Sequence, residues 1–418
     1  MKKSTELSGQ PLHQRAVCAE AAPALPRRAT EPEMSQTPAR LRGRRTRLRG
    51  FGLGLGLGLG LGLGGCQPSG PPANADMGPT TGMLSSNVGT GPALPNNPQD
   101  AAIWVSSADA NNSLVLATER TQVTGRLYSY NLIGQNAQSS NPLMQPGLVD
   151  VKSGFLLGGQ TLDLAAVAEA GTALIRFFSI DRTTGQLTDI TGFADVFKDR
   201  TGESAVPVGV ALYRRPSDNL GFVVVSPRSG PMTDYLYQYR LDYAAGKINL
   251  TYVRKFGEFS TISTPGDADV KGILIDDAAG YLYYTDKSFG IRKYLADPDA
   301  PNANTELTVF GQTEFSGDRN GLALYTKDDG TGYLLSVDQT ATQSRVLLWR
   351  REGVPGYPNN HVMAATLNLN ADFIDGIAVT SASLGDKYPN GLLAVSNRSG
   401  KNFLYYSWQD IASALKFN

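Results

Sequence analysis

The chain has 418 residues, of which 41% are hydrophobic and 18% are charged, so it is long enough to bury a large core. Its 38 basic residues equal its 38 acidic residues; this balance argues neither for nor against a polyanionic partner, and no nucleic-acid partner is expected. His361 is the only histidine beyond His13, and the cysteines are Cys18 and Cys66, which disfavours histidine-based zinc sites, histidine nucleophiles and cysteine phosphatase chemistry in the folded part.

Residues 1–66 have the features of an export leader. Residues 40–49 carry six arginines and no acid, and an alternating Leu-Gly run follows over residues 51–63. A basic run, an apolar run too short to span a bilayer, and small residues before Cys66 are typical of a lipoprotein signal peptide. We therefore predict that Cys66 is acylated and becomes the mature N-terminus, with Met34 as the candidate true start. The expected location is the bacterial cell envelope, periplasmic or outer surface, or the extracellular space.

Residues 67–98 are rich in Pro, Gly, Ser and Asn. This composition does not bury a core, so the segment is predicted to be a disordered tether. The folded domain is expected to occupy residues 99–418, and to be a monomer that contacts a membrane only through the lipid on Cys66.

The first part of that domain contains short apolar runs that alternate with polar, Gly-containing turns, a pattern that predicts β-strands. Two early sheets are expected from the runs at 100–104, 114–118, 126–130, 148–151, 162–167, 174–180 and 186–190. Helical periodicity is weak, with candidates only around 194–198 and near the C-terminus.

A hairpin recurs four times in the second part of the domain. The four copies are Gly209–Ser226, Gly272–Asp286, Asp318–Asp338 and Gly376–Asn397. Each is followed by another apolar strand, at 235–241, 291–295, 345–349 and 403–408. A unit of three or four strands recurring roughly every 50–60 residues is the signature of a β-propeller blade. We predict an all-β, six-bladed β-propeller, closed by an N-terminal strand that pairs with the last blade.

Propeller geometry indicates where chemistry should be found. The residue before the inner-strand glycine is equivalent from blade to blade, and so is the residue after the second strand. The first ring, before the inner-strand glycines, consists of Val208, Lys271, Asn320 and Asp375. The second ring, after the second strands, consists of Arg228, Asp286 with Lys287, Asp338 and Asn397. A residue at the rim can also be polar only because it faces water, and for any single position this explanation is favoured over a binding role. Together they make a plausible site for a charged ligand.

Elimination of histidine and cysteine leaves carboxylate chemistry with a hard metal such as calcium, which takes oxygen ligands. The candidate carboxylates are Asp100, Asp286, Asp318 and Asp375. Arginine forks suit phosphate, and Arg120 and Arg228 stand at blade-edge positions.

The order of motifs resembles the β-propeller phytases, secreted calcium-dependent enzymes that remove phosphate from inositol hexakisphosphate. The resemblance extends from Asp100 to Ala412. It is carried by DAAIW at 100–104, NSLVLAT at 112–118, LDLAAV at 162–167, FSIDRTTGQL at 178–187, DGTGYLL at 329–335, IDGI at 374–377, YPNGLL at 388–393 and WQDIA at 408–412. It implies a six-bladed propeller in which calcium ions bridge carboxylates and substrate phosphates, and an activated water attacks phosphorus.

Carried over residue by residue, the resemblance implies three sets of site residues. The catalytic set is Asp100, Asp318 and Asp375. For substrate phosphate, Arg120 and Arg228 fall at or near family lysines and keep their charge, and Lys271 and Lys287, although they depart from the family pattern, complete the predicted set. The calcium ligands are Asp100, Asp286, Asp318, Asp375 and Asn397. The implied partner is phytate or another phosphorylated small molecule.

Several positions depart from the family pattern. Lys271 stands where the family has a glutamate, Asn320 replaces a second glutamate, and Asn397 replaces an aspartate. Lys287 fills the second place of a family Glu pair, and Val208 replaces a tyrosine. Losing carboxylates and gaining Lys271 should weaken calcium binding, because the charge of the ligands tunes calcium affinity.

Two hypotheses from different classes remain. The first is a phytase-like phosphoester hydrolase that uses calcium. The second is a catalytically weakened propeller that binds an anionic ligand or a protein at the cell envelope. The order of motifs favours the first, and the chemistry of the site favours the second.

Overall fold

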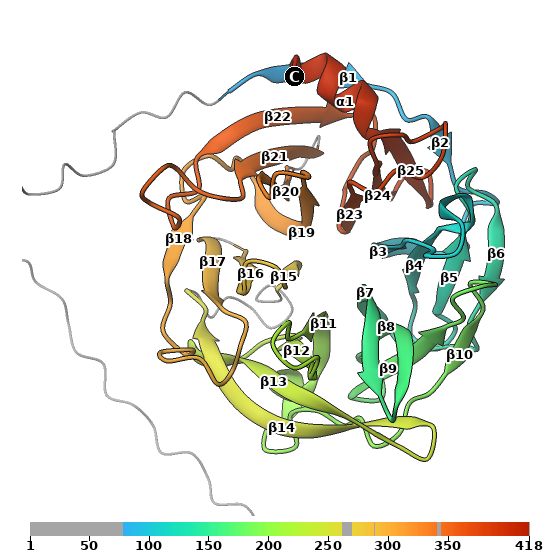
Figure 1. Ribbon diagram of the computed structural model, residues 1–418, viewed down its shortest axis with the longest axis vertical. Coiled ribbons are helices and arrows are strands. Elements are labelled where there is room, and N and C mark those ends of the chain that lie inside the picture. The colour runs from blue at the N-terminus through green and yellow to red at the C-terminus, as the bar shows by residue number, and fades with distance from the viewer. Residues whose placement is uncertain (1–77, 261–269, 288, 341–343, 418) are drawn as a thin grey trace, which may run out of the picture. The chain divides into compact units, whose positions relative to one another are not determined.

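Short runs of β-branched and aromatic residues fold into six sheets in the computed structural model, which describes residues 78–260, 270–287, 289–340 and 344–417. The sheets stand around a central axis as the blades of a β-propeller (Figure 1). Both the all-β class and the six-bladed architecture predicted from the sequence are confirmed.

The first three blades each contain four strands in chain order, from the axis outward. Blade 1 has β3 (Asn97–Trp104), β4 (Leu114–Arg120), β5 (Arg126–Tyr130) and β6 (Asn136–Ser139). Blade 2 has β7 (Pro146–Leu157), β8 (Gln160–Glu169), β9 (Leu174–Ile180) and β10 (Leu187–Asp189). Blade 3 has β11 (Pro207–Arg214), β12 (Gly221–Pro227), β13 (Thr233–Ala244) and β14 (Lys247–Glu258). Two single-turn helices, η1 (Ala110–Asn112) and η2 (Gly202–Ala205), lie in loops.

The last three blades follow the same plan. Blade 4 has β15 (Ile273–Asp276), β16 (Tyr281–Asp286), β17 (Gly290–Leu295) and β18 (Thr308–Phe310). Blade 5 has β19 (Asp318–Thr326), β20 (Gly332–Gln339), β21 (Ser344–Arg350) and β22 (Met363–Leu369). Blade 6 has β23 (Ile377–Thr380), β24 (Leu392–Asn397) and β25 (Asn402–Ser407), followed by helix α1 (Trp408–Leu415).

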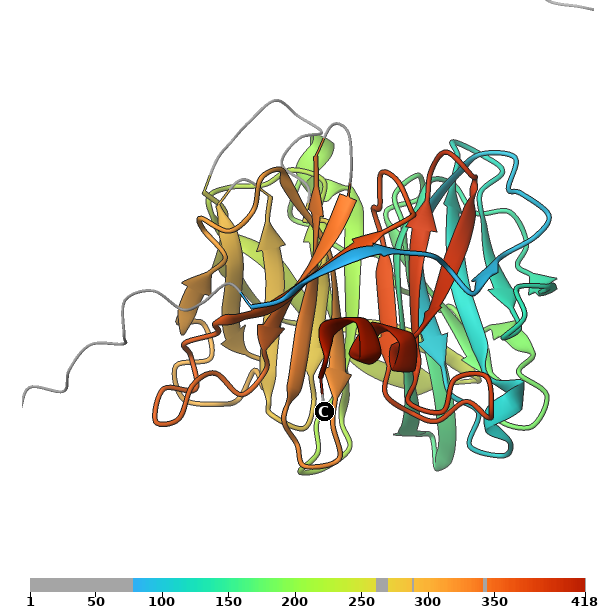
Figure 2. The ribbon, with the colours of Figure 1, turned by 90° about the horizontal axis from the view of Figure 1, so that it is seen from above.

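The N-terminal segment completes the last two blades. Strand β2 (Val88–Gly89) pairs antiparallel with β25, and β1 (Thr80–Leu84) pairs parallel with β22. Figure 2 shows this segment crossing the outer edges of the last two blades. The predicted closure of the ring by an N-terminal strand is therefore confirmed.

The prediction that residues 67–98 form a disordered tether is wrong for residues 80–89. Their composition is polar, but the outer edges of β22 and β25 offer unpaired backbone groups that the segment satisfies. Leu94, which is 4% exposed, anchors the segment in the core. The folded domain therefore begins before Gln99, whereas residues 67–77 and the predicted leader at 1–66 lie outside the described residues.

The hydrophobic core is divided into six layers, one between each pair of neighbouring blades. Successive strand residues enter different layers, because side chains alternate between the two faces of a sheet. On β3, for example, Ala101 packs between blades 6 and 1, whereas Ala102 packs between blades 1 and 2. Burying each large apolar side chain contributes about 1.5–3 kcal/mol, so the layers hold the ring together.

Glycines begin the inner strands because neighbouring blades approach closely there. A Cβ on Gly272 would lie 2.7 Å from the backbone nitrogen of Leu322, and one on Gly376 would lie 2.3 Å from Cα of Asp100. Any larger residue would push adjacent blades apart. This contact explains the inner-strand glycines Gly272, Gly321 and Gly376, whereas a Cβ on Gly209 would first meet Oγ of Ser226 in the same blade.

No helix among the described residues is long and apolar enough to cross a membrane.

Candidate functional site

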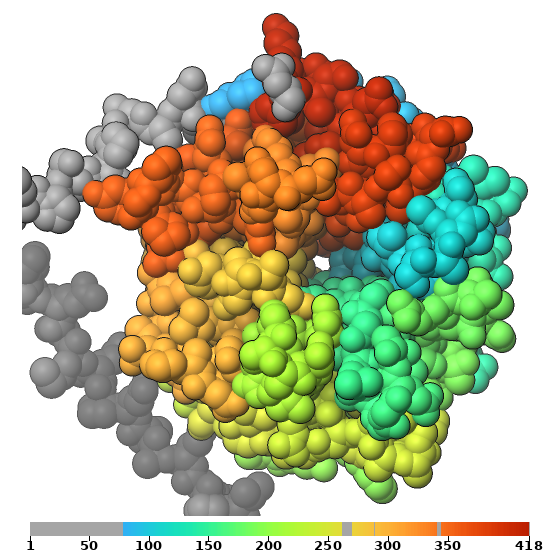
Figure 3. Space-filling model, in the orientation of Figure 1, coloured from blue at the N-terminus to red at the C-terminus, as the bar shows by residue number. Residues whose placement is uncertain are grey.

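The predicted site residues gather at one end of the ring. The inner strands begin at this end and the antiparallel second strands finish there, so both predicted rings of rim residues share one face. We call this end, where the inner strands begin, the entry face. The space-filling view shows a narrow opening at the centre of the ring (Figure 3).

A cavity of about 160 Å³ lies in the central channel. It is lined by inner strands of all six blades, with apolar side chains that include Leu148, Ile273, Leu322 and Ile377. Pockets that enclose a whole drug-sized ligand are typically about 300–1,000 Å³. The channel is therefore large enough for a single phosphate group or a few waters, and a larger ligand would have to lie over its mouth.

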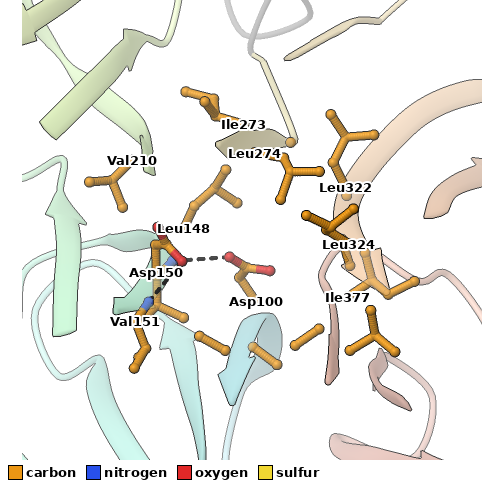
Figure 4. Close-up of a pocket in the computed structure, with 18 of the residues that line it drawn as sticks. Asp100, Leu148, Asp150, Val151, Val210, Ile273, Leu274, Leu322, Leu324 and Ile377 are labelled. Carbon is orange, nitrogen blue, oxygen red and sulfur yellow. Dashed lines mark hydrogen bonds between the residues drawn. The ribbon is translucent and has the colours of Figure 1, made fainter. Parts of the chain in front are cut away.

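Asp100 and Asp150 both point into this channel (Figure 4). Asp100 accepts a hydrogen bond from the backbone N–H of Val149, with 3.0 Å between nitrogen and Oδ2. Burial raises the pKa of Asp100 to about 8, and the carboxylates of Asp150 and Asp375 add to the rise. Deeper in the channel, Lys152 forms a salt bridge with Asp277 and donates to the carbonyl of Ile275.

Two other predicted catalytic carboxylates form ion pairs with basic residues. Asp375, at the start of blade 6, accepts a hydrogen bond of 2.5 Å from Nη2 of Arg398. Asp318, at the start of blade 5, lies 3.2 Å from Nζ of Lys287, and half of its side chain is exposed. Each carboxylate thus already has a cationic neighbour.

A repeated contact uses the residue at or next to the end of the second strand. In five blades its side chain accepts a hydrogen bond from the backbone N–H of the loop that leads to the inner strand. The pairs are Glu119 with Asn96, Glu169 with Met144, Asp286 with Ser260, Asp338 with Gly317, and Asn397 with Asp372. We call these five side chains the loop anchors. They fix the height of each loop at the entry face, much as a capping side chain does at a helix end.

Three loop anchors also hold an arginine on the third strand of their blade. Oδ2 of Asp286 lies 2.9 Å from Nε of Arg292, and Oδ2 of Asp338 lies 2.7 Å from Nε of Arg345. Glu169 makes a longer pair of 3.5 Å with Arg176. Because Asp286 and Asp338 are fully buried, these charges need their partners.

The loop-anchor contacts give roles to two predicted calcium ligands. Both carboxylate oxygens of Asp286 are engaged, by Ser260 and by Arg292. The amide oxygen of Asn397 accepts from Asp372, and its amide nitrogen donates to Asn402. The described contacts of both residues are those of structural side chains.

The predicted phosphate-binding residues are spread over the entry face. Lys271 lines the channel with Asp100, and Lys287 pairs with Asp318. Arg120 ends β4 in blade 1. Arg228 donates to Gln145 at 3.0 Å and to Glu203 at 3.3 Å, between blades 2 and 3. The structure thus brings Lys271 and Lys287 to neighbouring elements of blade 4, with Arg120 and Arg228 in other blades.

Sequence reasoning missed several cations at this face. Arg292, Arg345 and Arg398 each contact a carboxylate at this end of the ring. Arg319 is buried and donates to three backbone carbonyls, those of Gly311, Gln312 and Lys287. A signal was present, because an arginine follows the loop anchor by six or seven residues in four blades.

The residues present do not fit the calcium cluster that the resemblance implies. Calcium takes about six to eight oxygen ligands and needs clustered carboxylates. Among the described residues, no group of three or more acidic, histidine or cysteine side chains is placed to hold a metal ion. The acids are instead spaced around the ring, and four of them, Asp286, Asp318, Asp338 and Asp375, are paired with Arg or Lys.

Comparison with known proteins supports a family assignment. The family model described as Phytase matches residues 85–417. The 3-phytase of Bacillus subtilis (strain 168) is 25% identical over 327 residues, which cover 76% of this chain and 80% of that protein.

Comparison with solved structures finds chains of lower identity. A structural genomics protein of unknown function from Bacteroides thetaiotaomicron is 15% identical, with a TM-score of 0.44, and the match covers 78% of this chain and 74% of that one. The Dos1 propeller is 14% identical, with a TM-score of 0.36, and the match covers 74% and 68% of the two chains.

The family model extends from the closing strand β2 to the residues after α1, and so includes all six blades. The order of motifs in the sequence, the six-bladed ring and this match agree with one another. The chain belongs to the β-propeller phytase family.

Proposed function

We propose that this protein hydrolyses phosphate esters of the phytate class at the entry face. Its membership of the phytase family over the whole propeller carries the proposal. The arrangement of acid–base pairs around the mouth of the channel supports it, because phosphoryl transfer needs positioned cations for the phosphates and carboxylates for the attacking water.

The side chains of blades 4 to 6 suggest which residues would bind phosphate and which would orient the attacking water. Lys287 and Arg398 would hold phosphate oxygens, since an arginine fork suits phosphate and a lysine serves as a point charge. Asp318 is half exposed and therefore open to water and substrate, so it is our candidate for orienting the attacking water. Asp375 would position Arg398 through their 2.5 Å hydrogen bond.

The test is phosphate release from phytate by the full chain, with calcium varied from chelated to millimolar levels. We expect release, and we expect Asp318→Asn to lower it by about a hundredfold, in the range seen when an acid–base group is removed. Asp328→Asn is the matched control, because Asp328 lies in the exposed turn between β19 and β20, at the opposite end of the ring. A folded protein that releases no phosphate at any calcium level would contradict hydrolysis.

A second candidate function is binding without turnover, as an anionic-ligand or protein-binding module. The specific observation that favours it is the pairing of entry-face carboxylates with Arg and Lys, together with Lys271 at the channel. Phytate that binds but is not hydrolysed would support this candidate.

We also propose that the protein is exported and held in the cell envelope by a lipid on Cys66. The order of basic run, apolar run and cysteine in the sequence supports this. In cell fractionation, Cys66→Ser should move the protein from the membrane fraction to the soluble fraction. If the variant stays with the membrane as the parent does, Cys66 is not the anchor.

A further inference from the structure

We infer that the entry face holds its phosphorylated ligand with its own cationic side chains, in the place where the family would use calcium ions. This inference rests on the proposed function, in which phosphate esters bind at this face. It concerns the source of the positive charge that meets the phosphates.

The first observation is the charge balance at the face. A hard divalent cation needs an excess of negative charge, which clustered carboxylates supply. Here Asp318 faces Lys287, Asp338 faces Arg345, and Asp375 faces Arg398. With these pairs formed, little uncompensated negative charge is left to attract a calcium ion.

The second observation is that the buried acids already accept hydrogen bonds from other parts of the protein. Asp286 and Asp338 are fully buried, and their oxygens accept hydrogen bonds from loop N–H groups and from arginines. Turning either carboxylate toward an ion would break its hydrogen bonds to loop N–H groups and to the arginine Nε, although Arg292 would keep Glu306 and Arg345 would keep Ser316. Each lost partner is unfavourable, because a buried group without a hydrogen bond keeps its full desolvation penalty, and the penalty is larger for a charged group.

The third observation concerns unused donors on the arginines. Asp375 takes one hydrogen bond from Nη2 of Arg398, and Nε of the same guanidinium has no hydrogen-bond partner among the described residues. Nε of Arg228 is in the same state. Both Nε atoms are buried, so a phosphate oxygen would have to accept from the outer Nη donors, and Arg398, with 42% of its side chain exposed, presents these more openly than Arg228 does at 19%.

The fourth observation is the position of Lys271. It lines the mouth of the channel in the same cavity as Asp100, one residue before the glycine that packs against blade 5. An ammonium here repels a divalent cation and attracts a phosphate dianion. Buried Arg319, whose described donors reach only backbone carbonyls, adds a further positive charge one blade away.

The experiment is a calorimetric titration of inositol hexakisphosphate into the full chain, once in EGTA and once in calcium. We expect the Kd to agree within about threefold between the two conditions. Lys271→Gln and Arg398→Gln should each weaken binding in EGTA by about tenfold or more, the effect of losing one charge-assisted hydrogen bond. Lys247→Gln removes an exposed charge at the hairpin between β13 and β14, at the opposite end of the ring, and should change nothing.

Circular dichroism and a thermal melt would verify that each variant is folded. Binding that occurs in calcium and disappears in EGTA would overturn the inference, yet leave the proposed function standing. Binding in both conditions that neither Lys271→Gln nor Arg398→Gln weakens would also overturn it. Absence of binding in both conditions would overturn the proposed function together with the inference.

Discussion

Asp338 shows how one side chain can organise a whole loop. It is fully buried, accepts from the backbone of Ser316 and Gly317, and pairs with Arg345. Asp338→Ala should lower the free energy of unfolding by about 2–5 kcal/mol, because it leaves two backbone N–H groups and Nε of Arg345 without an acceptor. Urea denaturation would measure this, with Asp328→Ala as the exposed control. A change below about 1 kcal/mol would contradict the loop-anchor role.

His361 gives the protein a pH dependence. Its Nδ1–H donates to the carbonyl of Arg350, so Nε2 accepts from the buried ammonium of Lys293 at 3.2 Å. Burial, together with the nearby ammonium of Lys293, lowers the pKa of His361 to about 4. The unfolded chain therefore binds more protons in the window between pH 4 and pH 6.5, and stability falls as the pH is lowered through that window.

We expect His361 to cost about 2 kcal/mol of stability between pH 7 and pH 5. His361→Gln should remove that part of the pH dependence, because glutamine does not titrate. Urea unfolding of both proteins at pH 7, 6 and 5 would measure the difference between the two slopes. Parallel slopes would mean that His361 titrates normally in the folded state.

At the residue scale, the sequence predicted where the site residues lie in the propeller, but not which groups they contact. Asp100, Asp318 and Asp375 lie at the entry face, as rim positions of a propeller should. The engagement of Asp286 by Ser260 and Arg292 depends on the height of a loop from the preceding blade, which no local pattern encodes. For the same reason the arginine partners were not recognised.

At the scale of elements, β2 closes the ring with only two residues. Its neighbours extend the contact: Asn87 donates to the carbonyl of Tyr405, Thr90 donates to that of Phe403, and Leu94 is buried. We expect a chain that lacks residues 1–96 to melt at least about 5–10 °C below a chain that lacks residues 1–77, because it loses these contacts and those of β1. A thermal melt of both chains would measure this, and equal melting temperatures would contradict the closing role.

The elements that repeat were predictable, and those that do not repeat were missed. The four hairpins each carry a glycine, an apolar strand and a polar turn, so each supports the assignment of the others. Strands β1 and β2 lie in a Pro- and Gly-rich stretch that has no strand periodicity. Their conformation is set by the open edges of β22 and β25, which the rest of the chain provides.

At the scale of the whole molecule, the ring sets the charge that an ion would meet. Lys271→Glu exchanges a cation for a carboxylate at the channel, close to Asp100, and should raise calcium affinity by at least tenfold. Adding Asn320→Glu should raise it further, although Asn320 is buried and donates to the carbonyl of Ile374, which makes the second change costly. Calcium titration would measure both affinities. No gain in Lys271→Glu would mean that this position does not face the ion path.

The strand that closes the ring, β2, is one of the first strands to be synthesised and one of the last that can pair. Residues 88–89 pair with residues 404–405, so more than three hundred residues must leave the ribosome before this contact can form. Contacts of such long sequence separation form slowly, and open sheet edges invite pairing with other chains. A nascent or prematurely terminated chain would therefore expose β22 or another unpaired edge to its neighbours. The incomplete chain is therefore more prone to pair with its neighbours than the closed ring is, whatever ligand the finished protein binds.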